Sequence, residues 1–190
     1  MTPIPFTSNE KAFLLAQARS MIEKTLQGQS LPEIPFEKLT DNLKQKGASF
    51  VTLTIDGQLR GCIGSLEAHQ PLIDDVREHA LQAAFEDYRF PPLTAEELSL
   101  IKIEISRLTL PMRLDYSDPE DLPGLLKPNI DGVILQDGLR RATFLPQVWE
   151  QLPEPEAFLS HLCVKMGASS NLWQKKILTV SLYAVEEFHE

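Results

Sequence analysis

The sequence predicts an α+β fold with a largely antiparallel sheet packed by helices. Two Asp-Gly pairs, at residues 56–57 and 137–138, each lie between apolar, β-branched runs, which is typical of tight hairpins. Helical patterns alternate with these hairpins along the chain. Tight turns join antiparallel neighbours, whereas paired parallel strands need a longer crossover. A chain of 190 residues is long enough for a single domain over residues 1–190, with one core or with one core and a smaller lobe.

The chain opens with a helix. Thr7 and Glu10 have the spacing of a capping box, and apolar residues then recur at helical spacing until Gly28, which is suited to end the helix. A shorter helical piece is expected within residues 36–47.

A hairpin, a second helix and a strand follow. The hairpin covers residues 49–63, and Pro71 opens a helix whose face of small residues allows close packing on a sheet. Thr94 and Glu97 repeat the capping-box spacing in a short turn or helix. Residues 101–105 alternate between isoleucine and polar side chains, which predicts a strand with one apolar and one polar face.

The second half of the chain repeats this pattern. Residues 110–131 are rich in proline and either wrap a surface or form a small lobe. The second hairpin is expected over residues 133–145. Pro155 opens a helix that Gly167 closes, and one last strand is expected over residues 177–185.

Charge and composition disfavour several classes of function. The formal net charge of −9 repels phosphate backbones, so we expect no nucleic-acid partner. No run approaches the ~18 apolar residues that cross a bilayer, so we expect no membrane span. Residues 1–5 lack the basic and apolar regions of a leader, and the only cysteines are Cys62 and Cys163. These features predict a cytoplasmic protein with reduced thiols.

The strand at residues 60–64 carries the most chemistry. Strand alternation places Arg60 and Cys62 on the same face, about 7 Å apart. A guanidinium at that range favours a thiolate, and the lack of side chains at Gly61 and Gly64 lets a ligand come close. The alternative is structural: the glycines serve a bulge or a packed helix, Cys62 is a small core residue, and Arg60 pairs with a carboxylate.

Two polar residues of the later strand are further candidates. Glu104 and Ser106 lie on the polar face of the strand at 101–105. If that strand belongs to the same sheet as Cys62, Glu104 either orients Arg60 or transfers protons itself; otherwise this face is solvated. The four histidines show no zinc spacing, so we expect no metal site, and Cys163 is interpreted as core. Phosphate-loop and Gly-x-Ser-x-Gly motifs are absent.

Several segments together resemble one family, the AMMECR-type domain, in the bacterial branch called AmmeMemoRadiSam system protein A. The similarity runs from about Phe13 to Phe188. The segments that carry it are Leu59-Arg60-Gly61-Cys62-Ile63-Gly64, Ala83-Ala84 with Asp87, Arg89-Phe90 and Pro92, Glu104-Ile105-Ser106, Gly132-Val133, Phe144-Leu145-Pro146-Gln147-Val148, Phe158-Leu159 with Leu162-Cys163, Lys165 with Gly167, and Trp173.

The resemblance implies an α+β fold with a larger sheet-containing part and a smaller lobe around a cleft. It also implies a Memo-like protein and a radical SAM protein as partners, and it names neither a reaction nor a cofactor. The residues that match its motifs add Arg89, Ser106, Gln147 and Lys165 to the candidate ligand-binding positions.

Two hypotheses of function follow. In the first, the protein is an enzyme or enzyme component with a Cys62 thiolate, which Arg60 stabilises while Glu104 positions the substrate. In the second, it is a binding or adaptor module that holds an anionic small molecule or peptide through Arg60 and Lys165. A nucleic-acid role is the weakest hypothesis because the chain is acidic.

Overall fold

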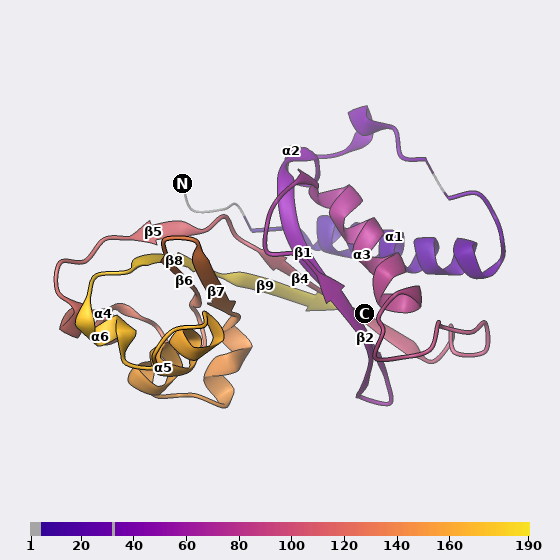
Figure 1. Cartoon of the computed structure of the whole chain (residues 1–190). Helices are drawn as coiled ribbons and strands as arrows, with labels where there is room; N and C mark the ends of the chain where they lie inside the picture. Colours follow the sequence, from indigo (N-terminus) through magenta and orange to yellow (C-terminus); the bar gives the residue numbers. More distant parts are fainter. Residues whose placement is uncertain (1–4, 32) are drawn as a thin grey trace. The chain divides into compact units, whose positions relative to one another are not determined.

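The computed structural model describes residues 5–31 and 33–190. The first four residues, on which the expectation of no leader partly rests, lie outside this part. The described chain divides into two compact units, one formed by the residues up to Leu108 with Glu186–Glu190 and the other by Thr109–Val185. The ladders that β1 forms with β2, β3 and β4, and those that β8 forms with β5 and β6 and β6 forms with β7, are antiparallel, and helices pack on the sheets, so the predicted α+β class is confirmed (Figure 1).

The first unit contains a sheet with the strand order β2-β1-β4-β9, and β3 also pairs with β1. Its elements are α1 (Ser8–Leu26), a 3₁₀ helix (Phe36–Lys38), α2 (Asp41–Lys44), β1 (Lys46–Ile55), β2 (Gln58–Gly64), β3 (Gln70–Pro71), α3 (Leu72–Phe85), β4 (Ile101–Leu108) and β9 (Val185–His189). The helices α1 and α3 pack together on one face of the sheet (Figure 1). The core of this unit lies between them and the fully buried Val51, Leu53, Ile103 and Ile105.

Local signals explain where α1 begins and ends. The side chain of Thr7 accepts a hydrogen bond from the backbone N–H of Glu10, and the Glu10 carboxylate accepts one from the N–H of Thr7, so the predicted capping box is confirmed. Gly28 has φ 63°, and the N–H groups of Gly28 and Gln29 donate to the carbonyls of Thr25 and Lys24. This is the pattern of a Schellman motif, which requires a residue with positive φ at this position.

The second unit contains a sheet with the order β5-β8-β6-β7. Its elements are β5 (Met112–Leu114), a 3₁₀ helix (Pro119–Asp121), α4 (Leu122–Leu125), β6 (Gly132–Asp137), β7 (Arg140–Phe144), a second 3₁₀ helix (Pro146–Glu150), α5 (Pro155–Lys165), α6 (Leu172–Lys175) and β8 (Thr179–Tyr183). A core of its own surrounds the stacked rings of Trp149 and Phe158, whose centroids lie 3.7 Å apart. Cys163 is fully buried in this core, as predicted.

Two details of the predicted elements are wrong. The second hairpin turns at Gly138 and Leu139, because Asp137 still pairs with Arg140; Gly138 has φ 61°, which fits a two-residue loop with glycine first. The predicted last strand is two strands, since Thr179–Tyr183 belongs to the second sheet and Val185–His189 to the first. Among the described residues, no helix is both long and apolar enough to cross a membrane.

Candidate functional site

The first hairpin positions Cys62. Its turn residues Asp56 and Gly57 have φ 50° and 76°, the conformation of a two-residue hairpin loop in which both residues have positive φ. The register shifts between Leu53 and Thr54, which leaves Arg60 as the extra residue of β2. Beyond this bulge, Cys62 lies directly opposite Thr52 of β1.

Cys62 belongs to the face of the first sheet that points away from α1 and α3, which we call the site face. Because side chains alternate along a strand, the buried Val51 and Leu53 place Thr52 on the site face. The buried isoleucines of β4 place Glu104 there in the same way, and Thr52 lies opposite Glu104 as well as opposite Cys62. A thiol, a hydroxyl and a carboxyl therefore form one row across β2, β1 and β4.

Strand β9 adds two titratable groups to the site face. Phe188 packs into the core, so strand alternation turns its neighbours Glu187 and His189 to the opposite face. Both contribute to the electrostatic field at Glu104. Neither residue was predicted, because the last strand was expected to end at residue 185.

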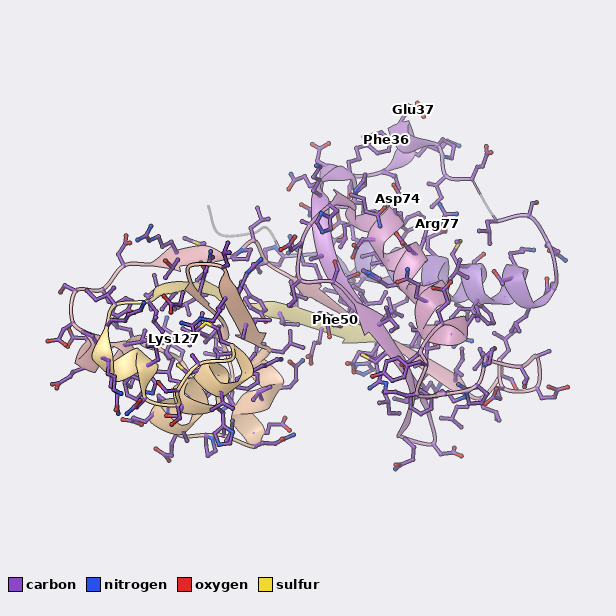
Figure 2. The ribbon with its side chains drawn as sticks, in the orientation of Figure 1. Phe36, Glu37, Phe50, Asp74, Arg77 and Lys127 are labelled. Carbon is purple, nitrogen blue, oxygen red and sulfur yellow. The ribbon has the colours of Figure 1, made fainter. Side chains whose placement is uncertain are left out.

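Burial and a like charge act on Glu104. Burial raises the pKa of this carboxyl, the negative charge of Glu187 raises it further, and His189 opposes the shift. Glu104 thereby keeps a proton to higher pH than a solvated glutamate, as a general acid requires. Ser106, the next residue on this face, is buried and lies opposite Phe50. Figure 2 labels Phe50 on β1, and Asp74 and Arg77 on α3.

The thiol of Cys62 is half-buried and has one hydroxyl donor. Oγ1 of Thr52 donates to Sγ of Cys62 over 3.3 Å. The backbone N–H of Cys62 donates to Oδ2 of Asp87 over 2.9 Å, and its carbonyl oxygen accepts from Nη2 of Arg89 over 3.0 Å. Both backbone groups therefore point away from β1, so Cys62 and Thr52 form a non-hydrogen-bonded pair, the kind in which facing side chains lie closest.

Asp87 and Arg89 form a closely bonded pair beside Cys62. Nε of Arg89 donates to Oδ1 of Asp87 over 2.9 Å, Nη2 to Oδ2 over 2.6 Å, and the backbone N–H of Arg89 to Oδ1 over 3.2 Å. The Arg89 guanidinium lowers the pKa of Asp87 well below its usual range, and the Cys62 N–H adds to this shift. The pKa of Arg89 is raised, chiefly by Asp87 and in smaller part by the charge of Cys62.

Arg60 is bonded to a carboxylate that the sequence analysis did not select as a site residue. Its Nε and Nη2 donate to the two carboxylate oxygens of Glu97 over 2.7 and 2.9 Å, and the N–H of Thr94 donates to the same carboxylate. The Arg60 hydrogen bond, helped by Thr94, lowers the pKa of Glu97 from 4.5 to about 2. The ring of Phe90 lies 6.0 Å from the Arg60 guanidinium. A carboxylate partner for Arg60 is what the structural alternative predicted.

The two glycines of β2 are sites of close packing. A Cβ atom on Gly61 would lie 2.1 Å from the carbonyl oxygen of Ala83 in α3. One on Gly64 would lie 2.3 Å from the carbonyl oxygen of Ser49 and 2.4 Å from the ring of Phe50. Neighbouring atoms therefore already occupy the space that each missing side chain leaves.

Two predicted site residues, Gln147 and Lys165, lie in the second unit. Nζ of Lys165 donates to the carbonyl of Thr143 over 2.9 Å and lies 5.0 Å from the Phe144 ring centroid. Gln147 lies in the 3₁₀ helix Pro146–Glu150 and is exposed. Within the described ranges, no three His, Cys, Asp or Glu side chains gather as metal ligands would.

Comparisons with known proteins identify the family. The AMMECR1 family model matches residues 15–188. A protein of Methanothermobacter thermautotrophicus is 38% identical over 98% of this chain and 97% of its own, and protein MJ0810 of Methanocaldococcus jannaschii is 35% identical over 97% and 92%. The crystal structure of the uncharacterised protein PH0010 from Pyrococcus horikoshii matches with a TM-score of 0.81 at 31% identity, over 97% of this chain and 93% of that one. The chain therefore belongs to the AMMECR1 family.

Proposed function

We propose that this protein is an enzyme or enzyme component in which the thiolate of Cys62 is the nucleophile and Glu104 is the acid–base group. The observation that carries the proposal is the row on the site face, where the Thr52 hydroxyl donates to the sulfur and Glu104 follows on the next strand. A hydroxyl donor favours the thiolate over the thiol. Neighbouring strands are about 4.8 Å apart, so Cys62 and Glu104 are about 10 Å apart at their backbones with Thr52 between them, and a substrate that meets both would lie over Thr52.

The reaction class that this pair supports is acyl transfer. The thiolate attacks the carbonyl carbon of an acyl donor, a sulfur–carbon bond forms, and the bond from that carbon to the leaving group breaks. In its protonated form, which the raised pKa favours, Glu104 gives its proton to the leaving group. Its carboxylate then takes a proton from the water or acceptor that attacks the thioester, and the cleaved sulfur leaves as thiolate. The raised pKa of Glu104 supports both roles.

We assign the cation beside the thiolate to Arg89. Arg60 directs two of its donors to Glu97, whereas Nη2 of Arg89 donates to the Cys62 carbonyl over 3.0 Å. The binding-module hypothesis depended on Arg60 and Lys165, and an anionic ligand would have to compete with Glu97 for Arg60 and with the Thr143 carbonyl for Lys165. The thiolate hypothesis requires no such displacement.

Trapping a covalent adduct tests the proposal. The protein is mixed with a series of acyl thioesters and aryl esters, and the modified residue is identified by intact-mass and peptide mass spectrometry. We expect an acyl group on Cys62 in the native protein and in Cys163→Ser, the matched control, and none in Cys62→Ser. Glu104→Gln should still be acylated by esters with good leaving groups but should lose the acyl group at least about tenfold more slowly. Acylation of Cys163 in place of Cys62, or of neither, would contradict the proposal.

The resemblance also supports a proposal about partners. We propose that the protein acts in the cytoplasm with a Memo-like protein and a radical SAM protein, as in the AmmeMemoRadiSam system. The reduced state of two unpaired cysteines is compatible with that compartment. Co-purification of the tagged protein with both partners from cells that express all three is the test. Recovery of the tagged protein alone, at native expression levels, would contradict it.

A further inference from the structure

We propose that Asp87 and Arg89 are positioning residues for Cys62, which hold its peptide groups and set the charge felt by its sulfur. This inference rests on the proposed function, because it concerns the same thiolate. The pair contacts both backbone groups of Cys62, since Asp87 accepts from its N–H and Arg89 donates to its carbonyl. Strand β2 is an edge strand, so at this residue the two side chains take the place of a neighbouring strand.

The position of Asp87 is unfavourable for the helix that precedes it. Asp87 comes just after Glu86, the C-cap of α3, at the helix end where a negative charge is destabilising, and the last turn of α3 holds no basic residue. Asp87 is also 4% exposed, and a buried carboxylate needs compensation. That compensation comes from Arg89 and from the N–H of Cys62. A carboxylate that serves only α3 would not be expected here, which points to a role at Cys62.

The two charges of the pair act on the sulfur with opposite signs. Arg89 favours the thiolate and Asp87 disfavours it. Other charged or titratable groups on the surrounding elements are Glu104 on β4 with Glu187 and His189 on β9, Tyr88 beside Arg89, and Arg60 on β2 with its partner Glu97. Strand β1 contributes only the uncharged hydroxyl of Thr52 at this position.

This opposition gives a test that a merely structural pair would fail. The rate of iodoacetamide alkylation of Cys62 is measured against pH by peptide mass spectrometry in the native protein and in single variants. Arg89→Gln removes the positive charge, so we expect the pH midpoint of alkylation to rise by about one unit. At a pH below the midpoint, the fraction of Cys62 present as thiolate would then be about tenfold lower. Asp87→Asn removes the negative charge, so we expect the midpoint to fall. Arg89→Lys keeps the charge and should leave the midpoint near the native value.

If the substitutions only loosened the strand, the pH midpoint of alkylation would shift in the same direction in Arg89→Gln and Asp87→Asn, and that result would overturn the inference. A midpoint that neither substitution changes would overturn it as well. Thermal unfolding of each variant checks that the fold is retained, and Arg89→Lys gives a folded comparison if Asp87→Asn proves unstable. The proposed function fails separately. If the midpoints shift in opposite directions but no acyl adduct forms, the positioning role of Asp87 and Arg89 is supported and acyl transfer is rejected. If an adduct forms but the midpoints do not shift, acyl transfer is supported and the positioning role is rejected.

Discussion

Replacement of Gly61 by alanine would put a Cβ atom 2.1 Å from the carbonyl oxygen of Ala83, more than an ångström inside ordinary contact. The obstacle is backbone, so a side-chain rotation cannot relieve it, and either β2 or the end of α3 must move. Overpacking of this kind costs up to about 3 kcal/mol. Alanine also lowers the entropy of the unfolded chain, which offsets about 0.5 kcal/mol. We therefore expect Gly61→Ala to lose about 2 to 3 kcal/mol of unfolding free energy.

Thermal unfolding followed by circular dichroism measures this loss. For a chain of this size the expected decrease in Tm is about 5 to 10 °C. Gly124→Ala is the matched control, because its Cβ would meet nothing within 4 Å and it lies within α4, where alanine is favourable. It should melt at or above the native temperature. If Gly61→Ala melted within about 2 °C of the native protein, the packing of α3 on β2 described above would be refuted.

Three further predictions concern the groups around Cys62. Arg60 lowers the pKa of Glu97 from 4.5 to about 2, so the ion pair contributes stability above pH 4.5 that is lost as the pH falls from 4.5 to about 2. Glu97→Gln should therefore flatten the plot of unfolding free energy against pH in this range, and an unchanged slope would argue against the ion pair. Thr52→Val keeps the shape of the side chain but removes the hydroxyl donor to Sγ, so alkylation of Cys62 at neutral pH should slow about threefold; an equal rate would show that the hydroxyl does not act on the thiolate. Glu187→Gln removes a like charge, so the pKa of Glu104 should fall in a carbon-13 NMR titration; a constant value would place Glu187 outside its range.

Much of the fold could be predicted because the signals are local. The capping box at Thr7 and Glu10 and the positive φ of Asp56 and Gly57 depend on residues that are close in sequence. The switch of sheets at Ala184 could not be predicted in this way. The alternation of side chains continues through Ala184, so the sequence pattern shows no break there. The break comes from contacts with Thr109, which is distant in sequence: the backbone N–H of Ala184 donates to Oγ1 of Thr109, and the carbonyl of Ala184 accepts from the N–H of Thr109.

The site was predictable at its strand, and the family motif included Asp87 and Arg89, but the hydrogen bonds of these two residues and the role of Glu97 were not predictable. Strand alternation and the hairpin located Cys62, and the polar face of β4 located Glu104, which the structure places in the same sheet. The carboxylates that accept hydrogen bonds from β2 lie 25 to 37 residues away in the sequence: Asp87 accepts from Cys62, and Glu97 accepts from Arg60. The capping-box spacing at Glu97 was a signal for its bond to Thr94, but no spacing rule links a carboxylate to an arginine on another element.

One ratio of rates decides whether Cys62 carries an activated thiolate. The alkylation rate constant of Cys62 is measured at neutral pH in the native protein and in the same chain unfolded in urea, with Cys163 resolved by peptide mass spectrometry as the internal comparison. We predict that Cys62 reacts about tenfold faster in the folded protein, although its thiol is half-buried there, while the fully buried Cys163 reacts more slowly than in the unfolded chain. A folded rate for Cys62 equal to or below the unfolded rate would show that the fold does not activate this thiol.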